Sequence, residues 1–113
     1  MTAPKKIKAK NWAETDIIQP DEIISVGWDF YEELGTSESV TAKTVSATDS
    51  SGTDVTTTIV KSSSIANGDG TNSAVHVVLQ SLVNGEKYTV KIEATITADK
   101  ILVAKIKVPC VDF

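Results

Sequence analysis

The residues best suited to nucleophilic or base chemistry are the single His of the chain, His76, and its single Cys, Cys110. A catalytic nucleophile needs a base beside it to accept its proton. His76 falls on the outward face of a predicted strand, and Cys110 lies near the end of the chain, close to Val108 and Val111. We therefore interpret His76 as a surface or interface residue and Cys110 as a small apolar side chain. The sequence predicts no catalytic residue, and hence a non-enzymatic protein.

The segment NGDGTN at residues 67–72 has the composition of a calcium-binding loop. An EF-hand with Gly70 at its sixth position would place Ile65 first and His76 twelfth, where carboxylate ligands are required. The sequence therefore excludes an EF-hand. A looser calcium site in the Asp-rich loops stays open, with Asp49, Asp54 and Asp69 as its candidate ligands. We otherwise predict no metal and no cofactor.

The chain is acidic, with 15 Asp and Glu residues against 11 Lys, and its formal net charge is −4. It contains no Arg. Nucleic-acid binding needs cations that neutralise phosphates, and Arg in particular recognises them through paired hydrogen bonds. The composition therefore argues against nucleic acid as a partner. We interpret the lysines clustered near the start of the chain as a solvated tail: Lys5, Lys6, Lys8 and Lys10.

The composition also bears on location and fold class. No apolar run is long enough for a membrane span or for the hydrophobic region of a secretory signal, so we expect no membrane partner and a protein made in the cytosol. The chain has 24 Val and Ile residues and 25 Ser and Thr residues. Richness in Val, Ile and Thr favours β-strands.

Apolar and polar residues alternate with a period of two over most of the chain, which predicts strands with one buried and one exposed face. The predicted strands are 24–30, 40–47 with a β-bulge, 55–60, 74–80, 88–96 and 101–108. The last two are joined by a short connection and predict a β-hairpin. The polar residues 62–73 predict a long loop, and residues 29–34 are the best helix candidate, although a very short one.

These strands, without a convincing helix, favour a single all-β domain. An edge strand at Ile17 and Ile18 would raise the count to about seven antiparallel strands, as in an immunoglobulin-like β-sandwich. We assign residues 1–19 to a partly flexible N-terminal arm and residues 20–113 to the sandwich.

The most specific local pattern is LVNGEKYTVKIEA at residues 82–94, where a turn at Gly85 precedes Tyr88 at the start of an alternating strand. A Tyr in this position forms a tyrosine corner, in which its hydroxyl bonds to the backbone a few residues upstream. This stretch, and the Trp28 in ISVGWDF, resemble fibronectin type III modules. The resemblance implies a sandwich with Trp28 and Tyr88 in its core, while Trp12 is expected outside it.

The order of features also resembles a family of small proteins from the structural gene modules of tailed phages and prophages. The matching positions are Pro20-Asp21-Glu22, Trp28-Asp29, Leu34-Gly35, and Gly85 with Tyr88. That family is similar to immunoglobulin-like virion components such as tail-associated adaptors. The resemblance implies a virion structural protein, in the tail or head–tail region, whose partners are other virion or assembly proteins. The alternative is an adhesive or spacer sandwich domain of a bacterial surface protein.

Ile101 and Val103 are the predicted partner-contact residues. Both lie on one outward face of the last strand, near the expected edge of its sheet, where a neighbour can add. Flanking lysines could instead keep this edge free of other chains: Lys100, Lys105 and Lys107. We expect contact with a virion protein or with a second copy of the chain.

Overall fold

The computed structural model describes residues 12–14, 18–20, 22–97 and 100–111. The strands are β1 (Trp12–Glu14), β2 (Ile24–Asp29), β3 (Val40–Thr48), β4 (Val60–Ala66), β5 (Ala74–Leu79), β6 (Lys87–Ile96) and β7 (Ile101–Pro109). Two short helical segments, η3 (Tyr31–Glu33) and α1 (Thr56–Ile59), lie between them. The predicted all-β fold class is confirmed.

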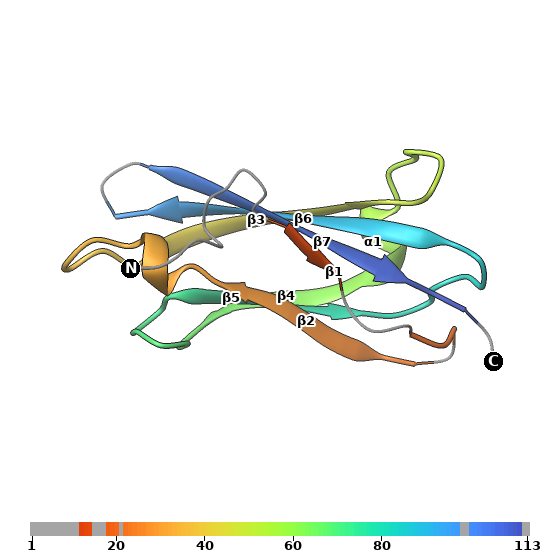
Figure 1. Cartoon of the computed structure of the whole chain (residues 1–113), viewed down its shortest axis with the longest axis horizontal. Coiled ribbons are helices and arrows are strands. Elements are labelled where there is room, and N and C mark those ends of the chain that lie inside the picture. Colours follow the sequence, from red (N-terminus) through yellow and green to blue (C-terminus); the bar gives the residue numbers. More distant parts are fainter. Residues whose placement is uncertain (1–11, 15–17, 21, 98–99, 112–113) are drawn as a thin grey trace.

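The strands form two sheets that lie face to face (Figure 1). The four-stranded sheet has the order β1-β7-β6-β3, and the three-stranded sheet has the order β2-β5-β4. The predicted hairpin of the last two strands is confirmed, since β6 and β7 pair antiparallel from Lys87 opposite Pro109 to Thr95 opposite Ile101. The result is a sandwich-like arrangement in which each strand turns one face toward the other sheet.

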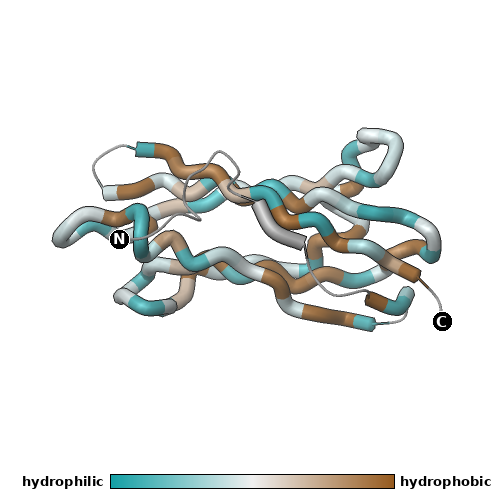
Figure 2. The backbone as a smooth tube through the Cα atoms, in the orientation of Figure 1, coloured by the Kyte–Doolittle hydropathy of each residue, from teal (hydrophilic) through white to brown (hydrophobic). Residues whose placement is uncertain are grey.

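The core lies between the two sheets and follows from the period-two alternation. Along β6 every second residue is buried, and hydrophobic and hydrophilic residues alternate along the strands in Figure 2. The opposite sheet contributes Val75, Val77 and Leu79, which are fully buried on β5. Burying apolar side chains from both sheets against one another is the main stabilising term of such a fold.

The predicted strand 55–60 is wrong, and the predicted loop 62–73 contains a strand. The Asp54 carboxylate accepts hydrogen bonds from the Thr56 N–H at 2.9 Å and from the Thr56 hydroxyl at 2.6 Å, which favours the helical turn α1 over an extended chain. β4 follows α1 directly and ends at Ala66. Its serines pair with β5 through backbone groups, which need no apolar side chain, so the polar composition concealed the strand.

The bulge predicted within residues 40–47 is present, but at the start of β3. The register with β6 shifts between Val40 and Ala42, before the slip in apolar positions from Ala42 to Val45 that predicted it. The extra residue turns Val40 back toward the core, where it is 3% exposed. Ala42 is exposed, so the apolar pattern alone misplaced the irregularity.

The N-terminal arm predicted for residues 1–19 contributes to the four-stranded sheet. β1 pairs with β7, from Trp12 opposite Lys105 to Glu14 opposite Lys107, and Ile18 forms an isolated bridge with Cys110. The pairing is parallel, whereas we expected only antiparallel strands. A parallel pair is possible here because β1 and β7 are not joined by a hairpin: the chain crosses from β1 to β2 in the opposite sheet. The prediction for Ile17 lies outside the described residues.

The sequence predicted Trp28 as a buried core residue, and this prediction is wrong. Trp28 is half-buried and packs against the core, whereas Phe30, two residues later, is 0% exposed. The reason is position: β2 borders the three-stranded sheet, and no strand within the described residues lies on its other side, beside Trp28. The side chain of Trp12 lies outside the described residues.

Candidate interaction surface

Tyr88 fixes the connection between β5 and β6. Its side chain is 2% exposed, and its hydroxyl oxygen accepts a hydrogen bond from the Val83 N–H at 2.8 Å. This is the geometry of a tyrosine corner. Burial raises the pKa of Tyr88 above its ordinary value of 10.0, against the lowering effect of the bond from Val83. The ring therefore sits in the core while Val83, which is 58% exposed, faces solvent.

The loop between β3 and α1 is tied to the start of β6. The Ser50 N–H donates to the Glu86 carboxylate at 2.9 Å, and the Lys87 N–H donates to the Ser50 hydroxyl at 2.8 Å. Within the loop, the Asp49 carboxylate accepts the Ser51 N–H at 2.9 Å. These side chains hold backbone groups in place rather than point into a shared site.

Asp29 organises the loop of residues 67–73 at the other end of the sandwich. One oxygen of its carboxylate accepts the Asp69 N–H at 2.7 Å, and the other accepts the Tyr31 N–H at 3.0 Å. Any side chain at Gly68 would overlap this carboxylate. Ser73 is fully buried below the loop and accepts the Gly68 N–H at 3.1 Å. The loop with calcium-like composition is thus held by protein hydrogen bonds.

The three Asp residues of the looser calcium site do not come together. Asp49 and Asp54 follow the end of β3, whereas Asp69 lies beside the end of β2, at the opposite end of the sandwich. Hydrogen bonds from the Thr56 hydroxyl and then the Thr56 N–H lower the pKa of Asp54, so its charge stabilises a turn. In the part of the chain that the structure describes, no group of three His, Cys, Asp or Glu side chains is placed to hold a metal ion.

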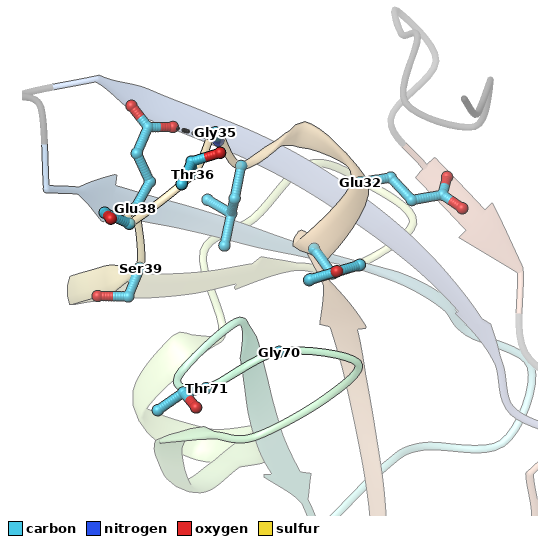
Figure 3. A pocket seen from close by; sticks show the side chains of 10 residues that line it. Glu32, Gly35, Thr36, Glu38, Ser39, Gly70 and Thr71 are labelled. Atoms are coloured by element: carbon cyan, nitrogen blue, oxygen red, sulfur yellow. Dashed lines mark hydrogen bonds between the residues drawn. The ribbon is translucent and has the colours of Figure 1, made fainter.

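An open groove of about 830 Å³ lies between η3, the segment that follows it and the 67–73 loop (Figure 3). The Glu38 carboxylate lines this groove; it accepts a hydrogen bond from the Gly35 N–H at 2.7 Å and forms an ion pair with Lys100 at 2.9 Å. The bond from Gly35, followed by that from Lys100, lowers the pKa of Glu38. Glu32 points away from Glu38 in Figure 3, so the groove does not bring two carboxylates together as an acid–base pair.

Ile101 and Val103 lie on the outer face of β7, as their spacing requires. Ile101 is 63% exposed and Val103 is half-buried. We expected β7 near the border of its sheet, but β1 lies beside it and forms that border. The described part of β1 pairs only with Lys105–Lys107, farther along β7. Ile101 therefore begins β7 as an exposed aliphatic side chain beyond the paired part of β1.

The outer face of the three-stranded sheet carries small residues at its centre, among them Ser25, Gly27 and Ser64. His76 lies there, exposed as predicted, and a side chain at Gly27 would meet both the Val75 carbonyl oxygen and the His76 ring. The sequence did not single out the role of Asp29 or of Gly27. Both depend on segments far apart in the chain meeting in the fold, and the Trp28-Asp29 pair was the only local signal.

No known protein family, curated protein or solved structure matches this chain in sequence or fold. None of the described helices has the length and apolar character needed to span a membrane.

Proposed function

We propose that the fold is an immunoglobulin-like/fibronectin type III-like β-sandwich. Three features support this assignment. β2, β5 and β4 form one sheet while β3, β6 and β7 form the other, as the second, fifth, fourth and the third, sixth, seventh strands do in that class. Tyr88 bonds to the backbone five residues upstream, at Val83, across the corner before β6. The sheets pack through alternating apolar residues.

We further propose that the protein is a non-enzymatic structural or interaction module of a phage or prophage virion, in the tail or head–tail region. The observation that carries the contact role is Ile101, a large aliphatic side chain 63% exposed at the start of β7, with Val103 on the same face. The resemblance at Trp28-Asp29 and Tyr88 supplies the partner class. Carboxylates that hold backbone groups, such as Asp29 and Glu38, also suit a structural module.

The test is to purify intact particles from the producing strain and to look for the chain by mass spectrometry. The substitution Ile101→Lys should lower the amount of the chain in particles. Val83→Lys is the matched control, because Val83 is 58% exposed but lies at the opposite end of the sandwich. Absence of the wild-type chain from particles and from assembly intermediates would refute the proposal. Its recovery on the bacterial surface would instead support the adhesive or spacer alternative.

A further inference from the structure

Border strands need protection, because their outward N–H and C=O groups can pair with another chain. Within the described residues, three of the four border strands carry such protection. β1 has only three residues. β3 is bulged at its start and carries Lys43 on its core-facing side, opposite the buried Ala94. β4 is bulged around Lys61, the residue skipped between Val60 and Ser62 in its register with β5.

β2 is the exception. It borders the three-stranded sheet (Figure 1) and pairs with β5 without a shift, from Ile24 opposite Leu79 to Asp29 opposite Ala74. Its sequence, ISVGWD, contains neither Lys nor Pro, and its single charge comes at its last residue. None of the devices that protect the other borders is present on this strand.

The backbone groups that face the open side of β2 can be assigned. The Phe30 N–H donates to the Ser73 carbonyl oxygen at 2.9 Å, which continues the β2–β5 ladder by one residue. Residues of an antiparallel strand alternate in the direction of their backbone groups. Val26 and Trp28 therefore point their N–H and C=O groups toward β5, whereas Ser25 and Gly27 point theirs to the open side, where no described strand pairs with β2.

The side chains of β2 are also less covered toward the ends of the strand than at its centre. Val26, in the middle of the strand, is 9% exposed, whereas Ile24 and Trp28 on the same face are only half-buried. Ile23, just before the strand, is 61% exposed. An added strand would cover the open sides of Ile24 and Trp28 with its own core-facing row, as neighbouring strands cover one another elsewhere in the sheet.

We propose that β2 is a docking edge whose occupant is β2 of a second copy of this chain, paired antiparallel about Val26. In this register Ser25 lies opposite the partner's Gly27, and both contribute edge-facing backbone groups. Ile24 lies opposite the partner's Trp28, which gives an aliphatic–aromatic pair on the core-facing side. Asp29 lies opposite the partner's Ile23, so no like charges meet. The strand is thus complementary to itself, and the contact closes as a two-fold dimer with one continuous six-stranded sheet.

This inference rests on the proposed function, because it names one contact through which such a module would assemble. Its main test is amide hydrogen exchange by NMR on the full chain at low and high concentration, with sedimentation on the same samples. In the monomer, the Val26 and Trp28 amides should exchange slowly and those of Ser25 and Gly27 quickly. As the dimer forms, the Ser25 and Gly27 amides should become protected.

Ser25→Pro removes an N–H that faces the open side, and Pro is tolerated at such border positions. It should weaken dimerisation at least tenfold, while Ser25→Ala, which keeps the N–H, should dimerise like the wild type. Melting curves report whether both variants fold. If Ser25→Pro does not fold, the hydrogen-exchange pattern of the wild type alone tests whether the dimer pairs through β2.

A chain that stays monomeric up to about 1 mM would overturn the inference. So would a dimer that protects the borders at β3 or β4 instead, or protection of Ser25 that appears only when another virion protein is added. Particles that contain the chain while Ser25 stays unprotected would refute the self-pairing and leave the proposed function intact. A dimer that pairs through β2, formed by a chain that is absent from particles, would support the self-pairing and refute the proposed function.

Discussion

Replacing Tyr88 by Phe should destabilise the fold through one lost hydrogen bond. The ring stays and only the hydroxyl goes, so the Val83 N–H, now bonded at 2.8 Å, loses its acceptor. A net hydrogen bond contributes about 1 kcal/mol, and a donor left without a partner costs somewhat more where water is excluded. Since Val83 is 58% exposed, water replaces part of the bond. We expect a loss of about 1–2 kcal/mol, equivalent to a fall of roughly 4–8 °C in Tm.

Urea unfolding and thermal unfolding would measure this loss, with Tyr31→Phe as the control, because Tyr31 is 48% exposed and outside the core. The pH dependence supplies a second readout. Burial raises the pKa of Tyr88, so this contribution to stability is complete below pH 10.0 and is lost as the pH rises through the raised value. Tyr88→Phe should lack this alkaline loss. A variant as stable as the wild type at neutral pH would refute the tyrosine-corner argument.

Further substitutions separate the core from its border and test the loops. Phe30→Ala should cost about 3–5 kcal/mol in urea unfolding, and Trp28→Ala clearly less, because Phe30 is fully buried and Trp28 is half-buried; equal losses would contradict this ranking. Gly68→Ala should lower Tm by forcing the Asp29 carboxylate off the 67–73 loop, and an unchanged Tm would show that the loop does not need this contact. Because the pKa of Glu38 is lowered, its contribution to stability is present above pH 4.5 and is lost as the pH falls through the lowered value; Glu38→Gln should flatten this acid limb, measured by unfolding across pH 2–6.

The parts of the fold that sequence could predict are those in which neighbouring residues alone decide the outcome. β6 alternates strictly and forms the predicted hairpin with β7, and Tyr88 needs only a turn and a strand start to form its corner. β4 could not be predicted, since its serines reveal neither a buried nor an exposed row. The prediction of an extended strand at residues 55–60 failed because two local hydrogen bonds from Thr56 to Asp54 outweigh the β propensity of Val and Thr.

The candidate surface was predicted in part for the same reason. The exposure of Ile101 follows from its place in an alternating strand. The sequence could not predict that Trp28 is only half-buried, because the exposure of a core-facing residue depends on which strand borders the sheet. The role of Asp29 depends on its meeting Asp69, forty residues later in the chain. Such long-range placements are set by the packing of the sheets and leave no local pattern.

The parallel pairing of β1 with β7 determines how this molecule responds to mechanical load. A force that pulls the chain before Trp12 away from the chain after Pro109 draws the two strands along each other in opposite directions, because they run the same way. The bonds between them, together with those of Ile18 to Pro109 and Val111 at 2.9 Å, are then stretched at the same time rather than one after another. An antiparallel pair loaded at one end would open like a zipper. In this chain the hydrogen bonds that join β1 to β7 share the load, so they must break together before either sheet begins to separate.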